Sequence, residues 1–190
     1  MIIVVAAILA VLTVPLTGRS LAPLANLSLK RVWLVWLSIG LQVAIISVFT
    51  LPKWLGQPLH LGTYALSGAF LWSNRHLPGA WILALGTALN LMAIVANGGT
   101  MPALASAWRT AGLAIAPNDF ENSNIVHNPR LPWLGDVFAV PKGWPFANVF
   151  SVGDVLVVVA IIYFVHVWCR RSATPDDETA PASSGLAAAG

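Results

Sequence analysis

One acidic side chain stands inside the long apolar stretches of this sequence, at Asp154. Burying an ionisable group among apolar residues is costly, so a carboxylate placed there is a candidate for ligand binding or acid–base catalysis. Ser151, three residues earlier, supports another interpretation, in which the serine caps a helix and Asp154 bonds back to the serine amide. A carboxylate at a helix N-terminus also suits the helix dipole. Capping and function therefore both stay open for Asp154.

Further polar side chains occur in the apolar stretches, close to the ends that meet residues 97–149. They are Gln42, His60, Tyr64, Asn90 and Asn97. Polar groups on helices in lipid turn inward and pair with one another, so we expect them to form a buried polar cluster with Asp154. Such a cluster serves either as interhelical glue or as a binding site, and the sequence supports both interpretations.

The sequence lacks the spacing that metal and nucleotide sites require. The four histidines are His60, His76, His127 and His166, and none pairs with another at a metal-ligand interval. The single cysteine, Cys169, excludes an intrachain disulfide. Asn97-Gly98-Gly99 is typical of a helix end followed by a turn. We therefore expect no metal and no cofactor. We also expect no nucleic-acid partner, because the basic residues are too sparse to follow phosphates.

Five apolar runs must position these residues. Hydrophobic residues make up 57% of the 190 residues and charged residues 9%, whereas roughly 25% charged is typical of soluble domains. Since a backbone in lipid must satisfy its hydrogen bonds within each segment, we predict an all-α integral membrane helical bundle. The predicted transmembrane helices are residues 1–16, 32–51, 59–73, 78–96 and 150–168. In the fourth, Ala80, Ala84 and Ala88 form a ridge of small residues that predicts close packing against a neighbouring helix.

Residues 1–171 are predicted to form one membrane domain with a single long connection, residues 97–149. A connection of this length far exceeds the usual four to six or so residues, and its proline and aromatic content predicts an ordered aromatic cap over the outer face. Trp144 is a candidate ligand-binding residue in this cap. Residues 103–116 carry apolar side chains at helical spacing and predict a short interfacial helix. The small, acidic residues 172–190 predict a disordered tail.

Basic residues and tryptophans predict the orientation. Most lysines and arginines near the ends of the runs fall in residues 17–31, 74–77 and 170–171, which the positive-inside rule assigns to the cytoplasm. The N-terminus and residues 97–149 are then outside, and the C-terminus is cytoplasmic. Trp33, Trp36, Trp72, Trp81 and Trp168 would mark the inner interface, and Trp54 and Trp144 the outer one.

Several segments resemble a family of small bacterial multi-pass membrane proteins classed as a domain of unknown function. The segments are NGGTMPA at 97–103, SN at 123–124, LPWLGDVFAVP at 131–141 and NVFSVGDVLVVVA at 148–160. The resemblance covers most of residues 1–170 and implies a polytopic fold in a bacterial cell membrane. Asn124, in the second segment, is a further candidate for ligand binding.

Residues 135–160 also resemble the end of signal peptidase II, the aspartyl enzyme that trims lipoprotein signal peptides. In that family an Asn-Val-Ala-Asp run opens the last helix and its aspartate is catalytic. Asp154 is the match, and Asp136 falls on an aspartate upstream of this run. The partner catalytic aspartate is expected near residues 124–127, where this chain has His127. A histidine cannot share a proton as a second carboxylate does, and the order of helices also departs from that family.

Two functions remain. The favoured one is a non-enzymatic membrane module that binds a lipid or a partner membrane protein through the outer aromatic loop and the polar cluster. Its ligand-binding candidates are Asn97, Asn90, Tyr64, His60, Asn124 and Trp144. The alternative is an intramembrane aspartyl hydrolase related to signal peptidase II, with Asp154 and Asp136 as catalytic candidates. Facing carboxylates of Asp136 and Asp154, within hydrogen-bonding reach in a cavity open to lipid, would favour the hydrolase.

Overall fold

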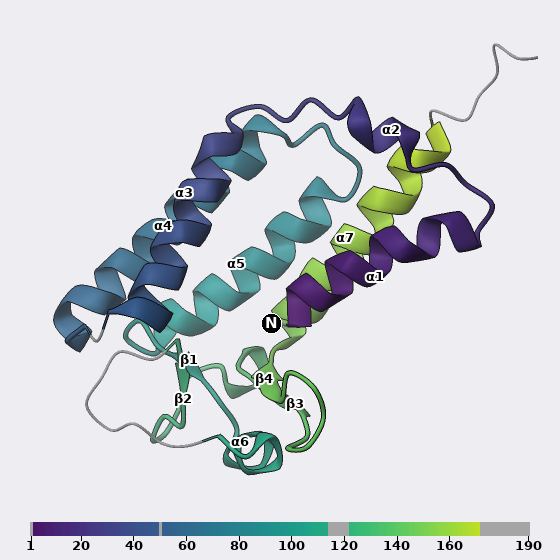
Figure 1. The fold of residues 1–190 in the computed structure, drawn as a ribbon. Coiled ribbons are helices and arrows are strands. Elements are labelled where there is room, and N and C mark those ends of the chain that lie inside the picture. Colours follow the sequence, from purple (N-terminus) through teal and green to yellow (C-terminus); the bar gives the residue numbers. More distant parts are fainter. Residues whose placement is uncertain (1, 50, 114–121, 172–190) are drawn as a thin grey trace, which may run out of the picture.

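The computed structural model describes residues 2–49, 51–113 and 122–171 and is predominantly helical (Figure 1). Each predicted apolar run forms a helix. The helices are α1 (Ile2–Leu16), α2 (Ala22–Ala25), α3 (Val32–Val43), which continues as a π-helical turn (Ala44–Val48), α4 (Lys53–Ser73), α5 (Ala80–Ala96), α6 (Ala105–Ala111) and α7 (Val152–Arg171). The predicted disordered tail, residues 172–190, lies outside the described residues.

The five long helices lie in a row, in the order α3, α4, α5, α7 and α1 (Figure 1). The tightest junction joins α5 to α7, where two glycines face each other. A Cβ atom added to Gly86 would lie 2.7 Å from the carbonyl oxygen of Gly153. Because neither residue has a side chain, the two backbones touch. The junction between α4 and α5 is the sparsest in the row.

The predicted packing of the alanine ridge is wrong. Ala80, Ala84 and Ala88 line a groove of about 200 Å³ between α4 and α5, and Ala88 is exposed. The close helix approach occurs instead on the face of α5 that carries Gly86. A ridge of small residues permits close approach, but glycine permits a closer one, and α7 packs where the backbone is most accessible.

Helix α4 is longer than the predicted span of residues 59–73. It begins at Lys53, directly after Pro52, and continues through Pro58. A proline inside a helix gives up one backbone hydrogen bond, and the predicted span began directly after Pro58. The buried polar face of α4 lies against α3, where Ser38 Oγ donates to the Thr63 carbonyl oxygen at 2.9 Å.

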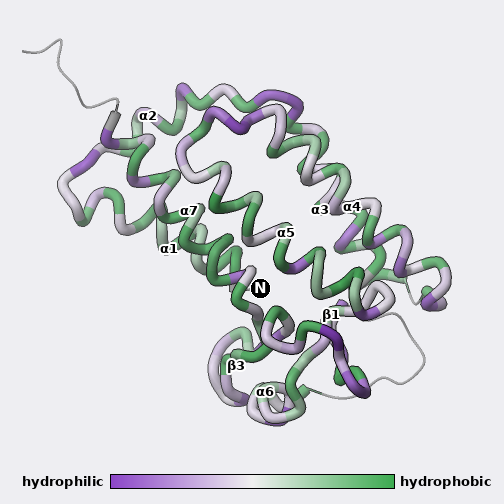
Figure 2. The backbone as a smooth tube through the Cα atoms, turned by 180° about the vertical axis from the view of Figure 1, so that it is seen from behind, coloured by the Kyte–Doolittle hydropathy of each residue, from purple (hydrophilic) through white to green (hydrophobic). Residues whose placement is uncertain are grey.

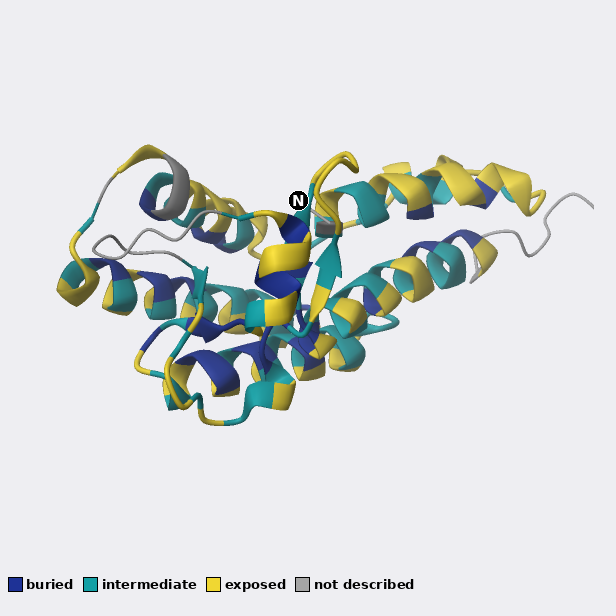
Figure 3. Ribbon diagram, turned by 90° about the horizontal axis from the view of Figure 1, so that it is seen from below, coloured by how far each residue is buried: buried dark blue, intermediate teal, exposed yellow. Residues whose placement is uncertain are grey.

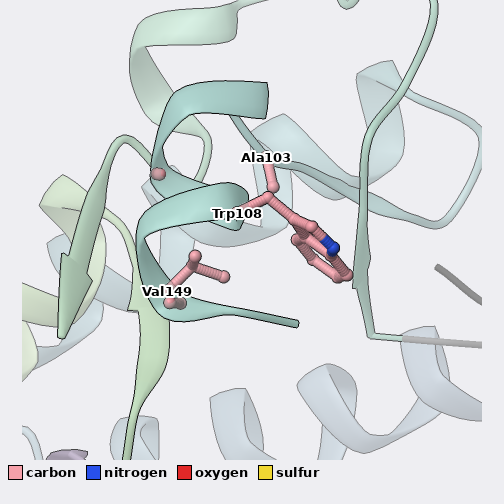
Figure 4. Close-up of a cluster of buried hydrophobic side chains, with 5 residues drawn as sticks. Ala103, Trp108 and Val149 are labelled. Atoms are coloured by element: carbon pink, nitrogen blue, oxygen red, sulfur yellow. The ribbon is translucent and has the colours of Figure 1, made fainter. Parts of the chain in front are cut away.

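The described parts of residues 97–149 are ordered around short strands. β1 (Met101–Pro102) pairs in parallel with β2 (Ser123–Asn124), and β3 (Phe138–Val140) pairs antiparallel with β4 (Asn148–Phe150). A 3₁₀ turn spans Pro132–Leu134. Trp108 of α6 packs with Ala103 and Val149 in a buried cluster beside these strands (Figure 4).

One boundary in this segment differs from the prediction. Helix α6 covers Ala105–Ala111 and not 103–116, because Gly112 takes a left-handed conformation with φ of 67°; residues 114–116 lie outside the described chain. Four aromatic side chains of the segment, Trp133, Phe138, Trp144 and Phe146, are exposed.

The outward faces of the long helices are apolar. Figure 2 shows hydrophobic stretches along the helices and hydrophilic residues concentrated in the connections at their ends, and Figure 3 shows exposed faces along the same helices. By length and composition, Val152–Arg170 of α7 is able to cross a membrane, whereas α1, α3 and α5 are apolar but shorter. The helices therefore give a weak indication of a membrane location.

Candidate functional site

Asp154 belongs to a closed network of hydrogen bonds at the start of α7. Asn90 Nδ2 on α5 donates to Asp154 Oδ1 at 2.8 Å, and the Ser151 amide donates to Asp154 Oδ2 at 2.9 Å. The Asp154 amide donates to Ser151 Oγ at 3.0 Å, and Ser151 Oγ donates to Asn90 Oδ1 at 2.7 Å. The Asn90 side chain and the Ser151 backbone amide thereby hold the two carboxylate oxygens of Asp154 in fixed directions.

The capping interpretation of Ser151 and Asp154 is confirmed, and Asn90, expected in the same polar cluster, lies close to Asp154. The two reciprocal bonds between Ser151 and Asp154 satisfy amides that the first helical turn leaves unpaired. Asp154, expected to be buried, is only partly buried, whereas Ser151 is completely buried. The Asp154 carboxylate lies at the N-terminus of α7, where the neighbouring segment covers it only in part.

Gly153 makes this network possible. A Cβ atom at this position would collide with Asn90 Oδ1, the atom that accepts from Ser151. The same glycine lies against Gly86 at the junction of α5 and α7. Helix packing and the orientation of Asp154 therefore depend on the same short stretch of backbone.

Asp136 is the second carboxylate of the site. It lies just before β3, where its amide donates to the Pro102 carbonyl oxygen at 2.8 Å and its own carbonyl accepts from the Leu104 amide at 3.1 Å. Asp136 is buried, with 4% of its surface exposed. Burial raises the pKa of its carboxyl from 3.8 to about 6, a hydrogen bond with Ser123 lowers it, and the nearby Asp154 raises it further. Asp136 therefore holds its proton more readily than an ordinary aspartate.

Asp136, and not His127, is the group that approaches Asp154. The two carboxylates interact electrostatically, but no direct hydrogen bond between them is present among the described side chains. His127 is exposed. Backbone pairing of residues 102–104 with Asp136 brings this carboxylate toward the start of α7.

Tyr64 and His60 of α4 border the carboxylates. Tyr64 interacts electrostatically with both Asp136 and Asp154, and its ring meets that of His60 edge to face, with 5.4 Å between the centroids. His60 is 2% exposed and its side chain interacts with Asn122. These two candidates lie on one side of the carboxylate pair, and Asn90 holds the other.

The other candidates have structural partners elsewhere. Gln42 donates to Thr63 Oγ1 at 2.9 Å within the junction of α3 and α4. Asn97 accepts from the Arg130 amide at 2.8 Å and donates to the Arg130 carbonyl oxygen at 2.7 Å, which ties α5 to the loop. Asn124 Oδ1 accepts from the next amide, of Ile125. Trp144 is 70% exposed. The predicted single cluster is thus divided into separate contacts.

The arrangement is suited to acid–base chemistry at two carboxylates in different surroundings. Asp136 is buried and retains a proton to about pH 6, while Asp154 receives hydrogen bonds from two N–H donors. Carboxylates whose surroundings differ in this way can divide the roles of acid and base. Within the described residues, no three histidine, cysteine, aspartate or glutamate side chains gather as a metal site requires.

Residues 26–166 match a family described as a family of unknown function, DUF5317. The chain belongs to this family. A protein of Thermotoga maritima, described as an uncharacterized protein, is 31% identical over 132 residues, which is 70% of this chain and 76% of that protein. No solved structure matches the chain.

The DUF5317 match contains every residue of the candidate site, from His60 to Asp154, and leaves α1 outside it. The predicted resemblance to a bacterial family of unknown function is therefore confirmed. The resemblance to signal peptidase II rests on the residues alone. Sequence reasoning did not identify Asn122 and Ser123, the partners of His60 and Asp136; the only signal was their place beside the quoted segment at 123–124.

Proposed function

We propose that this DUF5317 protein is a multi-pass membrane protein in which α1, α3, α4, α5 and α7 cross the bilayer. Large exposed apolar side chains support this proposal, since a soluble domain rarely exposes so many together. On these helices they include Ile8, Leu12, Trp36, Ile39, Leu85, Met92, Val159 and Ile162. Helices of 15 to 17 residues, as in α1 and α5, extend about 23–26 Å, so flanking residues must complete the crossing of a core about 30 Å thick.

Tryptophans support the same orientation as the basic residues. Trp33, Trp72 and Trp81 are exposed at one end of the row, near Arg31 and Arg75. Trp54 and Trp144 are exposed near the strand-bearing end. Aromatic belts at both interfaces and an excess of cations on one side are typical of membrane proteins. The strand-bearing end is then outside, together with the start of α1 (Figure 1).

Cysteine labelling tests this topology. Cys169 is replaced by serine, and single cysteines are introduced at Trp144 and at Ala173. An impermeant thiol reagent added to intact cells is expected to label the cysteine at 144 and to reach the one at 173 only after lysis. Labelling of both positions in intact cells would contradict the proposed topology.

We further propose that the chain is a membrane-embedded aspartyl hydrolase acting at the outer membrane interface. One observation carries this proposal: Asp136, buried and inclined to hold a proton, interacts with Asp154, whose oxygens are oriented by Asn90 and the Ser151 amide. The sequence disfavoured a hydrolase because no aspartate stands at residues 124–127. We assign the role of the second carboxylate to Asp136, which interacts with Asp154 without a direct hydrogen bond among the described side chains.

The chemistry follows from the two environments. Asp154, as the carboxylate, accepts a proton from a water molecule held between the two side chains, and the water oxygen attacks the carbonyl carbon of the substrate. Asp136, as the acid, donates its proton to the carbonyl oxygen, which becomes a hydroxyl. Collapse of the tetrahedral intermediate returns the proton to Asp136 and releases the leaving group with the proton from Asp154. A water between the carboxylates requires that they do not bond directly to each other.

The resemblance to signal peptidase II suggests the substrate to try. The full-length protein, reconstituted in vesicles, is incubated with a fluorogenic peptide that carries a diacylglyceryl cysteine. Wild type is expected to cleave the peptide, with a rate that declines as the pH rises above about 6, because Asp136 then loses its proton. Asp136→Asn and Asp154→Asn are each expected to lower the rate by roughly 10²–10⁴-fold. The matched control Ser67→Ala removes a side-chain hydrogen bond with Ser38, away from the carboxylates, and should cleave normally.

A cellular test does not depend on the choice of substrate. A strain that lacks the gene is complemented with wild type, Asp136→Asn or Asp154→Asn at equal membrane abundance. If the protein is a hydrolase, neither variant should rescue the defect that deletion of the gene causes. Rescue by both variants would show that the two carboxylates are not catalytic and would reject the hydrolase.

A non-enzymatic binding module remains the second candidate, and one observation favours it. The hydrogen bonds among Asn90, Ser151 and Asp154 close on one another, as expected of interhelical glue. The module would bind a lipid or a partner membrane protein through the exposed aromatic side chains Trp133, Trp144 and Phe146. Under this proposal Asp136→Asn and Asp154→Asn each rescue the deletion defect, whereas a variant with alanine at all three aromatic positions does not.

A further inference from the structure

The groove between α4 and α5 is an apolar feature that the carboxylate site does not use. Its walls come from Gly68, Leu71 and Trp72 of α4 and from Ala84, Ala88 and Leu91 of α5. Tyr64 borders it at the strand-bearing end and Arg75 at the opposite end. Because α4 and α5 are the least closely packed neighbours in the row, the groove between them is open along its side.

The size of the groove limits the kind of ligand that it can hold. Its volume of about 200 Å³ is below the roughly 300–1,000 Å³ of pockets that enclose a whole small molecule. Tyr64 lies nine residues before Ser73, the last residue of α4, which is about 14 Å along the helix. This length is close to half of a hydrocarbon core of about 30 Å, and thus to one leaflet. A groove of this length accommodates part of a single alkyl chain that enters from the Arg75 end.

The positive charge at the Arg75 end of the groove favours a lipid with an anionic headgroup. The Arg75 guanidinium lies 4.6 Å from the centre of the Trp72 ring and donates to the Trp72 carbonyl oxygen. Lys30 is held beside it, because buried Asn74 exchanges two hydrogen bonds of 2.9 Å with the Lys30 backbone. Lys30, Arg31 and Arg75 are all exposed. Asp136 and Asp154 lie at the opposite end, so among the described residues no acidic side chain faces these cations.

We propose that the α4–α5 groove binds one acyl chain of an anionic phospholipid from the inner leaflet, whose phosphate contacts Arg75. Trp72 and Trp81 flank the entrance at the level where tryptophan favours the lipid headgroups. The acidic side chains near Tyr64 disfavour the reverse orientation, with the phosphate at the Tyr64 end. The bound lipid is therefore a resident ligand and not the substrate of the carboxylates. The proposal depends on the membrane location of the helices and is independent of hydrolysis.

Native mass spectrometry of the full-length protein in detergent tests the proposal, with dioleoylphosphatidylglycerol and dioleoylphosphatidylcholine as probes. Wild type is expected to retain one phosphatidylglycerol in preference to phosphatidylcholine. Arg75→Gln should bind phosphatidylglycerol about fivefold more weakly, as loss of one cation at a membrane surface predicts, and Arg75→Lys should keep the preference. Arg109→Gln, which removes an exposed cation at the strand-bearing end, is the matched control and should bind as wild type.

A second pair of variants addresses the groove. Ala84→Phe fills it and should lose both lipids, whereas Leu85→Phe, on the adjacent exposed face, should retain them. Equal retention of the two lipids by wild type, or wild-type binding by Arg75→Gln and Ala84→Phe, would overturn the proposal. So would a dimer that Ala84→Phe dissociates, because a second copy of the chain would then occupy the groove. If Ala84→Phe does not fold, Arg75→Gln decides. Asp136→Asn should retain the lipid, so failure of the hydrolase would leave this result unchanged.

Discussion

Replacing Asp136 by asparagine is expected to stabilise the protein at neutral pH. The folded carboxyl has a pKa of about 6 in place of 3.8, chiefly because it is buried. Between these values the folded state holds a proton that the unfolded state has lost, so the free energy of unfolding decreases as the pH rises. The difference corresponds to about 3 kcal/mol, at roughly 1.4 kcal/mol for each tenfold change in proton affinity. Asparagine keeps an oxygen that accepts from Ser123 and has no charge to bury.

The measurement is thermal or denaturant unfolding of wild type and Asp136→Asn in detergent, followed by circular dichroism between pH 4 and pH 7. At pH 4 both side chains are neutral and the two proteins should be nearly equal in stability, which provides an internal control. Above pH 6 the variant should be more stable by about 3 kcal/mol. Titration of groups that do not interact with Asp136 cancels in the difference. A difference that does not change with pH, or a variant that is less stable at pH 7, would refute the buried, proton-holding carboxyl.

Three further substitutions test the packing around the site. Gly153→Ala should lower the free energy of unfolding by about 1–3 kcal/mol, because the new methyl group collides with Asn90, whereas Gly62→Ala, with open space around it, should be neutral or slightly stabilising in the same thermal melts. Ser151→Ala should cost about 1–2 kcal/mol through the lost cap, and a melting temperature equal to that of wild type would contradict the network. Trp108→Ala should destabilise the strand-bearing segment by about 3–5 kcal/mol, and limited proteolysis between residues 101 and 150 should detect it.

Local patterns predicted the local part of this site. The capping box at Ser151 and Asp154 requires only a spacing of three residues at the start of a helix, so the sequence contains all the information it needs. Asn90 was expected nearby because polar residues of neighbouring helices pair in an apolar environment. The closest helix contact, between Gly86 and Gly153, was not predicted. A small residue indicates that a close approach is possible but does not identify the neighbour.

The position of Asp136 could not be obtained from the sequence, because it depends on contacts between distant segments. Its backbone pairs with residues 102–104, about thirty residues earlier in the chain, and its side chain bonds to Ser123. The residues that bring Asp136 to Asp154 thus come from three separate parts of the segment 97–149. The resemblance to signal peptidase II implied a partner aspartate near residues 124–127, where this chain has His127, which lies at the surface.

Asp136 is for this reason a better indicator of function than Asp154. The capping bonds to Ser151 account for Asp154 without any ligand, since a carboxylate at a helix N-terminus is stabilising. Asp136 has no comparable explanation, because a buried carboxyl with a raised pKa destabilises the fold at neutral pH and asparagine would keep its bond to Ser123. Costly groups of this kind tend to gather at sites where chemistry needs them. The separate effects of Asp136→Asn on stability and on the cellular phenotype therefore decide between hydrolase and binding module.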